Sequence, residues 1–176
     1  MRLANKQISL RPQDLVVALK LVLLREKNFT YASLGAELAL APSEVHACIG
    51  RAVLARLVTQ SKRGGTTPIN SAIREFILHG VRYAFPAVSG PITRGMPTAY
   101  GAPIFKGRFQ PDETPVWPML DGQARGPALY PLYPSLPIAA AKDSQLYDIL
   151  TMIDAIRAGA AREREFAGAL IAERLI

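Results

Sequence analysis

The pattern of apolar and polar positions is clearest in the first third of the chain, where apolar residues recur at intervals of three and four. From Pro12 to Lys27 they form a wide stripe, which predicts one amphipathic helix. The stretch from Thr30 to Leu57 predicts two shorter helices that share a small core and are joined by a tight turn. Its apolar positions are Leu34, Leu38, Leu40, Val45, Ile49, Ala52 and Val53. Three consecutive helices are therefore expected here.

The two short helices have recognisable start signals. Thr30 is a good N-cap for the first of them, because its hydroxyl can accept a hydrogen bond from a backbone N–H of the first turn. Pro42 suits the first turn of the second, where its missing N–H costs nothing. Both signals favour a helix, a turn and a second helix over one longer helix.

A β-hairpin is predicted directly after these helices. Residues 57–60 and 66–69 are two short runs containing β-branched residues, and Ser61-Lys62-Arg63-Gly64-Gly65 separates them. Pro68 limits the second strand to an edge position. Lys62 and Arg63 are expected at the tip of the hairpin.

The outward face of the second short helix differs from an ordinary solvated helix, which carries long Lys and Glu side chains. Its residues are small or hydrogen-bonding: Ser43, Glu44, His46, Ala47, Gly50 and Arg51. Small residues let a helix lie deep in a DNA major groove. Arg51 can reach either a guanine edge or a phosphate, whereas His46 can equally be a surface residue without a role. Cys48 falls on the apolar side, so we expect a buried thiol.

Residues 12 to about 69 resemble a winged-helix domain of the broad bacterial regulator type to which the MarR-like proteins belong. In that family one helix supports a helix-turn-helix pair, and a hairpin wing follows and touches phosphate or the minor groove. The resemblance implies sequence-specific binding of double-stranded DNA by a repressor or an antitoxin-like autoregulator, usually as a homodimer. The expected DNA contacts are Thr30, Ser43, Glu44, His46, Ala47, Arg51, Lys62 and Arg63. The chain departs from the family pattern at Ala39 and Ala41, where a turn glycine and a capping serine are common.

The charge distribution agrees with this expectation. Residues 1–65 carry ten Lys or Arg against four Asp or Glu, so they hold six of the seven net positive charges of the chain. Phosphate binding through counterion release requires such an excess. A basic protein need not bind nucleic acid, but here the charge is concentrated in the segment that the hydrophobic pattern already singled out.

Composition sets the wider frame. With 176 residues, of which 49% are apolar and 20% charged, the chain can bury one core. No apolar run approaches the length of a bilayer span, and the N-terminus lacks the regions of a signal peptide, so a cytoplasmic protein without membrane contact is expected. A single cysteine excludes an intramolecular disulfide and a zinc site built on several thiolates.

The middle of the chain, residues 86–140, changes character. Eleven of the fourteen prolines and six of the thirteen aromatic residues lie between Pro86 and Pro137, which excludes long helices and argues against simple disorder. We expect an ordered, extended segment with short strands near residues 102–109. Packing and contact with a protein partner is the favoured role. The alternatives are a small-molecule pocket lined by Trp117, Tyr130 and Tyr133, or stacking on single-stranded nucleic acid.

Helices are predicted again on both sides of that segment. Residues 70–85 should form a connecting helix, with Asn70 as its cap. In residues 141–176, Asp143 or Ser144 can cap a helix, and Gly159 can end or kink it. The apolar stripe of this helix consists of Leu146, Ile149, Leu150, Ile153 and Ile156. By analogy with small regulators the stripe can form a homodimer, or it can fold back on the chain's own N-terminal domain.

The expected fold class is therefore mainly α: a winged helix over residues 1–69, a connecting helix, an extended segment and C-terminal helices. No catalytic motif is found, because Gly64-Gly65 lacks the pattern of a phosphate loop and the two histidines and one cysteine are scattered. We expect neither an enzyme nor a cofactor or metal. The alternative function is a protein-interaction adaptor that uses the same fold without binding DNA.

Overall fold

The computed structural model describes residues 8–25, 27–61, 65–109 and 112–175, and over these it is mainly helical with two small sheets. The N-terminal elements are α1 (Pro12–Leu24), α2 (Tyr31–Leu38), α3 (Pro42–Leu54), β1 (Val58–Gln60) and β2 (Thr66–Pro68). After them come α4 (Asn70–His79), α5 (Val81–Ala84), β3 (Ser89–Pro97), two 3-10 turns (Ala99–Gly101 and Pro103–Phe105), β4 (Val116–Pro118) and β5 (Ala124–Leu129). The chain continues with α6 (Leu136–Ala140), α7 (Ser144–Ala158) and α8 (Ala161–Arg174).

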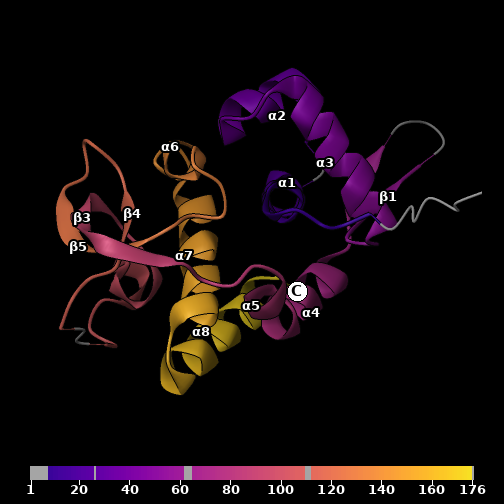
Figure 1. Cartoon of the computed structure of the whole chain (residues 1–176). Helices are drawn as coiled ribbons and strands as arrows, with labels where there is room; N and C mark the ends of the chain where they lie inside the picture. Colours follow the sequence, from indigo (N-terminus) through magenta and orange to yellow (C-terminus); the bar gives the residue numbers. More distant parts are fainter. Residues whose placement is uncertain (1–7, 26, 62–64, 110–111, 176) are drawn as a thin grey trace, which may run out of the picture.

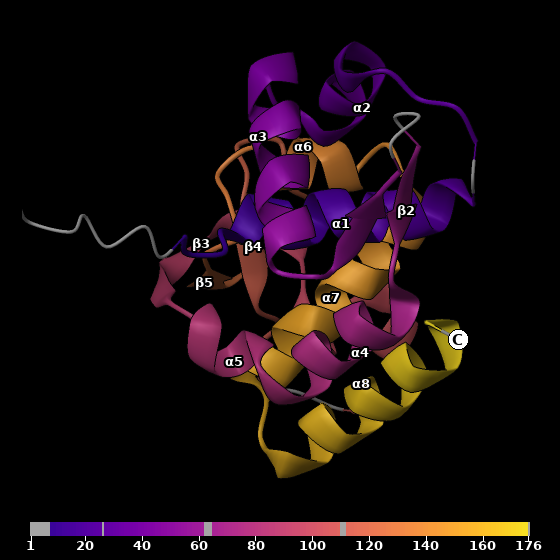
Figure 2. The same ribbon diagram turned by 90° about the vertical axis from the view of Figure 1, so that its right-hand side faces the viewer.

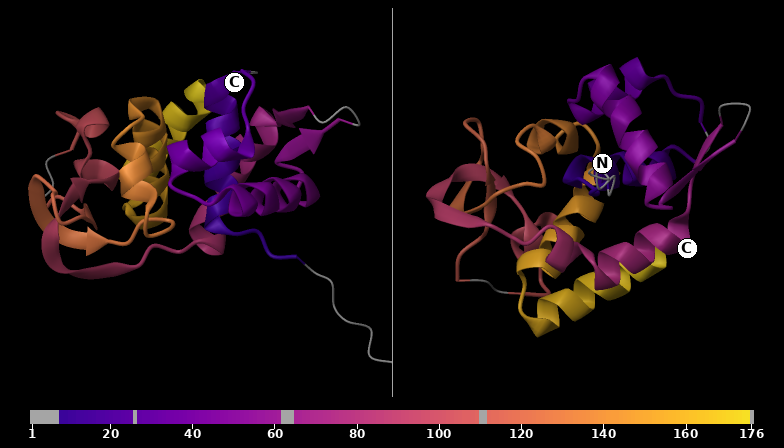
Figure 3. Two further views of the ribbon diagram at one scale, coloured as in Figure 1. Left: turned by 90° about the horizontal axis from the view of Figure 1, so that it is seen from above. Right: turned by 45° about the vertical axis from the view of Figure 1, so that its right-hand side comes forward.

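The elements form three layers. In Figure 1, α1 to α3 and the β1–β2 hairpin lie on one side, strands β3 to β5 lie on the other, and α7 and α8 run between them. The view from above in Figure 3 shows the same order. One apolar core runs through all the layers, from Leu15 of α1 to Ile171 of α8. Among the described residues, no helix is long and apolar enough to cross a membrane.

The start of α2 follows the sequence prediction. The Ser33 N–H donates to the Thr30 hydroxyl at 3.0 Å, and the Thr30 N–H donates to the Ser33 hydroxyl at 2.9 Å. This reciprocal pair satisfies two backbone donors at the helix end. Pro42 opens α3 in the first turn, as predicted.

The turn between α2 and α3 lacks the glycine that is common there and is stabilised in other ways. Ala39 adopts a left-handed conformation, with φ 53° and ψ 42°. Gly35, one turn earlier, is the glycine that the turn requires, because a Cβ there would lie 2.6 Å from the Leu40 carbonyl oxygen. From the C-terminal half, the Tyr133 hydroxyl donates to the Leu38 carbonyl at 2.9 Å, and the Ser135 hydroxyl donates to the Ala39 carbonyl at 3.0 Å.

Ala39→Gly should raise the free energy of unfolding by about 1 kcal/mol, because the left-handed conformation costs an L-residue about that much and costs glycine nothing. Urea unfolding measures the change. Ala36→Gly is the matched control: Ala36 is exposed and lies inside α2, so the same substitution should destabilise by about 1 kcal/mol there. Equal losses for the two variants would show that the conformation of Ala39 carries no cost.

The predicted hairpin is present. Strands β1 and β2 pair antiparallel, with Val58 opposite Pro68 and Gln60 opposite Thr66. The Ser61 N–H donates to the Gly65 carbonyl at 2.8 Å and closes the base of the turn. Lys62 and Arg63, the predicted tip, lie outside the described residues.

The connecting helix is two helices rather than one. α4 ends at His79, Gly80 follows it as its C-cap, and α5 begins at Val81. A Cβ on Gly80 would lie 2.9 Å from the Phe76 ring, so the chain comes close to this ring at the break. Asn70 is the first residue of α4, one position inside its expected place as the cap.

The middle segment forms a small closed sheet. β3 pairs antiparallel with both β4 and β5, and a parallel bridge between Val116 and Ala128 joins those two strands. The prediction of strands near residues 102–109 is wrong, because this stretch contains a 3-10 turn that Pro103 begins. The strands lie before and after residues 102–109 in the sequence, and the backbone comes close to neighbouring segments at their glycines. A Cβ on Gly126 would lie 1.8 Å from the Thr114 carbonyl oxygen.

The position of α7 decides between the two predicted roles of its apolar stripe, a dimer face or packing within the chain. All five of its residues are buried within the chain, since α7 packs against α1, α4, α5, α6 and α8. The stripe therefore folds back on the chain and is not an exposed dimer face. Asp143, rather than Ser144, caps α7, and its carboxylate also pairs with Lys20 of α1 at 2.6 Å.

A buried polar network fixes α7 to the second sheet. The Asp154 carboxylate accepts hydrogen bonds from the Trp117 indole N–H at 2.6 Å, from the Thr98 hydroxyl at 2.8 Å and from the Arg157 guanidinium. Arg157 also donates to the carbonyl of Phe85, between α5 and β3, at 2.7 Å. Burial raises the pKa of Asp154, and the charge of Arg157 opposes that rise. Because the partners come from four separate segments, we assign the network to folding rather than to chemistry.

Candidate nucleic-acid interface

The outer face of α3 is uncharged and open. Ser43, His46, Gly50 and Leu54 are exposed there, and Ala47 is partly exposed between them. Their spacing of three and four residues places them along one side of the helix. Figure 2 looks onto the side of the molecule that carries α3 and the hairpin. Leu54 is 65% exposed, which is unusual for a leucine, and a Cβ on Gly50 would meet nothing within 4 Å.

Arg51 does not belong to this open face. Its Nη2 lies 2.8 Å from Asp14 Oδ1 of α1 and 2.9 Å from Glu44 Oε1, and its Nε donates to Asp14 Oδ2 at 2.9 Å. The Arg51 side chain is 14% exposed and that of Asp14 is fully buried. Arg51 therefore connects α3 to α1, and Glu44 pairs with it from within α3. We leave both out of the proposed DNA contacts, because Nε and Nη2 of Arg51 and the carboxylate of Glu44 are engaged in these ion pairs.

The predicted buried thiol is confirmed. Cys48 is inaccessible and lies beside the same cluster, with its Sγ 3.4 Å from Arg51 Nη2. Burial is the largest cause that raises the pKa of Cys48 above its ordinary value, and the negative charge of Asp14 adds to it. The thiol therefore stays protonated at neutral pH and is no nucleophile.

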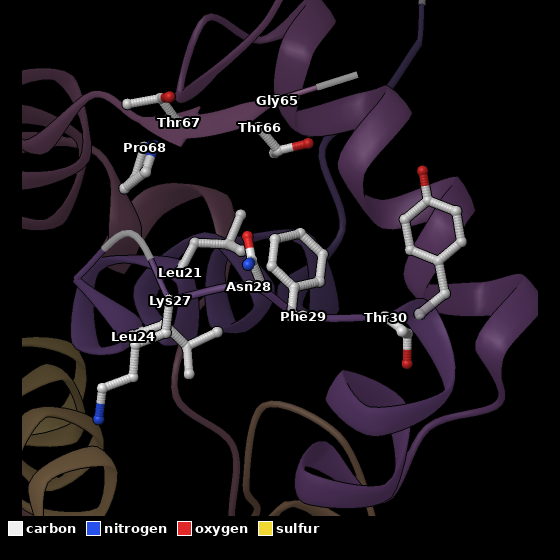
Figure 4. A pocket seen from close by; sticks show the side chains of 11 residues that line it. Leu21, Leu24, Lys27, Asn28, Phe29, Thr30, Gly65, Thr66, Thr67 and Pro68 are labelled. Carbon is white, nitrogen blue, oxygen red and sulfur yellow. The ribbon is translucent and has the colours of Figure 1, made fainter. Parts of the chain in front are cut away.

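A pocket of about 520 Å³ lies beside the start of α2. The end of α1, residues 27–31 and residues 65–68 of the hairpin line it. Figure 4 shows Leu21 and Phe29 on one side of the pocket, across from Thr66 and Pro68 of β2. Its polar groups come from the loop before α2 and from the hairpin.

One aromatic contact joins this pocket to the open face of α3. The ring of Tyr31, which lines the pocket, lies edge-on to the ring of His46 with 5.2 Å between centroids. Thr30 is exposed in the same region, and a hydroxyl that accepts the Ser33 N–H can still donate a hydrogen bond outward. The structure thus brings together Thr30, Ser43, His46 and Ala47 of the predicted set.

Sequence reasoning missed two features of this region. Lys27 is exposed and lines the pocket, and Leu54 extends the open face of α3 by one further turn. The spacing of Leu54, four residues after Gly50, was the signal that could have placed it on this face. The signal for the Arg51 pairing was Asp14, an acid at the edge of the apolar stripe of α1, because a buried carboxylate requires a cation.

The aromatic pocket considered for the middle segment is not formed by the residues proposed. Trp117 and Tyr133 are buried, and both donate their polar hydrogens to groups inside the protein. Tyr130 is exposed on the surface instead. In the part of the chain that the structure describes, no group of three or more His, Cys, Asp or Glu is arranged to hold a metal ion.

Comparisons with protein-family models, with curated proteins and with solved structures found no match to this chain. Function is therefore inferred from the geometry of the chain itself.

Proposed function

We propose that the protein binds double-stranded DNA with the open face of α3 in the major groove and acts as a regulator of transcription. The observation that carries the proposal is the adjacency of three parts: the open face of α3, the N-terminus of α2 and the hairpin-lined pocket, with Tyr31 and His46 in contact between the first two. Three helices followed by a two-stranded hairpin is also the order of a winged helix. That order supports the assignment of α3 as the helix that reads DNA.

In this proposal the residues divide into two groups. Ser43 and His46 hydrogen-bond base edges, and Ala47 and Gly50 let the helix approach them closely. Thr30, the N–H groups at the start of α2 and Lys27 contact phosphates. The predicted contacts of Lys62 and Arg63 with the backbone remain part of the proposal on the sequence alone.

A homodimer remains part of the proposal, because a dimer would present two copies of α3 to a pseudo-palindromic operator. A cytoplasmic location also remains part of the proposal. The dimer must use a surface other than the buried stripe of α7. Ile92 and Leu120, in and beside the second sheet, are exposed apolar side chains and support contact with a protein partner there.

A protein-interaction adaptor is the second candidate, and the composition of α3 favours it. None of the five residues on the open face of α3 is a Lys, Arg, Asp or Glu, and Leu54 exposes most of its surface. Depletion of charge with exposed apolar side chains is typical of the centre of a protein interface. The two candidates differ in whether the protein binds duplex DNA at all.

The substitution Gly50→Glu distinguishes DNA binding from the adaptor function and tests whether the open face of α3 contacts DNA. The new side chain meets open space, so the fold should be kept, but its carboxylate would oppose the phosphates of bound DNA. We expect the affinity for duplex DNA, measured by fluorescence anisotropy at about 0.1 M salt, to fall by about tenfold or more relative to Gly50→Gln.

Gly50→Gln is the matched control, because it adds the same bulk without charge. The ratio between the two variants should shrink as salt rises, since screening weakens the repulsion. If both variants bind at low salt as tightly as the parent, the face of α3 is excluded from the interface. If the parent binds no duplex even at low salt, the adaptor is the correct function.

A further inference from the structure

We infer that the core of each DNA half-site consists of A·T pairs, which α3 reads through the C5-methyl groups of thymine rather than through hydrogen bonds to guanine. This inference rests on the proposed function and specifies its substrate. The inference follows from which side chains of α3 are exposed to solvent and which are buried or held in ion pairs.

Bidentate readout of guanine by Arg51 is disfavoured by its ion pair with α1. The commonest specific contact to guanine is a bidentate hydrogen bond from Arg or Lys to its O6 and N7. Arg51 is the single Arg or Lys within α3, and its guanidinium is bound to Asp14 and Glu44. To reach a base it would have to leave the fully buried Asp14 carboxylate without a cation.

The open face of α3 instead offers apolar contacts. Ala47 presents a methyl group and Leu54 an isobutyl group, and Gly50 lies between them on the same face. In the major groove only thymine presents a methyl group, and apolar side chains are its natural partners. Gly50 permits the close approach that van der Waals contact with a methyl group requires.

The neighbouring polar residues are compatible with this reading. Ser43 can donate or accept a hydrogen bond at either kind of base pair, and His46 can do so through its ring nitrogens. They supply orientation, and the apolar pair supplies the preference for thymine. Removing one contacted methyl should cost about fourfold in affinity, which corresponds to about 0.8 kcal/mol for a buried methylene-sized group.

Selection from a random duplex library with the full chain is the first test. We expect the bound pool to converge on half-sites with A·T cores. A core that converges on guanines would overturn the inference and leave DNA binding intact. Absence of any duplex binding would overturn the proposed function, and the inference with it.

Replacing single thymines of the selected site by deoxyuridine is the second test, because it removes only the C5-methyl group. At one or two core positions we expect a loss of about fourfold, and we expect Ala47→Gly to abolish that loss at one of them. Ala169→Gly, at an exposed position within α8, is the control for the helix cost of glycine, and circular dichroism checks the fold. If no thymine shows a loss, or if the loss at every position is unchanged in Ala47→Gly, the inferred contact does not exist.

Discussion

Arg51→Met should lower the free energy of unfolding by about 3–5 kcal/mol, because it leaves the buried Asp14 carboxylate without its cation. Methionine keeps much of the length and the helix propensity of arginine, so the loss reports the ion pair rather than a cavity or a weaker helix. Chemical unfolding followed by circular dichroism measures it.

The double variant Asp14→Asn/Arg51→Met is the control for this interpretation. Asparagine can still accept the hydrogen bond that Asp14 receives from the Arg11 N–H at 2.8 Å, but it carries no charge. The double variant should therefore be less destabilised than the sum of the two single variants, by about 1–3 kcal/mol. Additive losses, or a loss below about 1 kcal/mol for Arg51→Met, would show that the pair contributes little.

This expectation changes how DNA binding should be tested. From the sequence, Arg51 is the most attractive base-reading residue on α3, and its truncation is the obvious experiment. In the structure the same truncation would also destabilise the fold, so a loss of binding would not by itself locate the interface. Gly50→Glu avoids the difficulty, because Gly50 has open space around it and no packed neighbour to lose.

The local elements could be predicted because each carries its own sequence signal. Thr30 and Pro42 mark the starts of α2 and α3, and the two runs around Ser61 mark the hairpin. Such signals act within a few residues, so the periodicity of one segment is enough to recognise them. The N-terminal elements were therefore predicted more accurately than the rest.

The contacts that decide the site could not be predicted in the same way. Asp14 and Arg51 are 37 residues apart in sequence, and Tyr133 meets Leu38 across 95 residues. A helical pattern places Arg51 on a side of α3, but it does not tell which element packs beside that side. The prediction of strands in the middle segment was wrong for a related reason. These strands pair across long separations in the sequence and approach one another closely at Gly95 and Gly126.

Asp154→Ala is expected to be as damaging as the loss of Arg51. It leaves the Arg157 guanidinium, the Trp117 indole N–H and the Thr98 hydroxyl without the carboxylate that they share. Leaving a buried charge and two buried donors unpaired should lower the free energy of unfolding by about 3–5 kcal/mol. Trp117 is the single tryptophan of the chain, so its fluorescence reports unfolding and the environment of the network together.

Asp148→Ala is the matched control, because it changes the same residue type in the same helix. Asp148 forms a partly exposed pair with Arg174 at 3.3 Å, and such pairs contribute about 0–1 kcal/mol. The two variants thus share the substitution and the gain in helix propensity, and they differ in burial and in the number of donors that lose their acceptor. A similar small loss for both would mean that water replaces the Asp154 carboxylate. A large loss for Asp154→Ala alone would show that this network stabilises the packing of α7 against the second sheet.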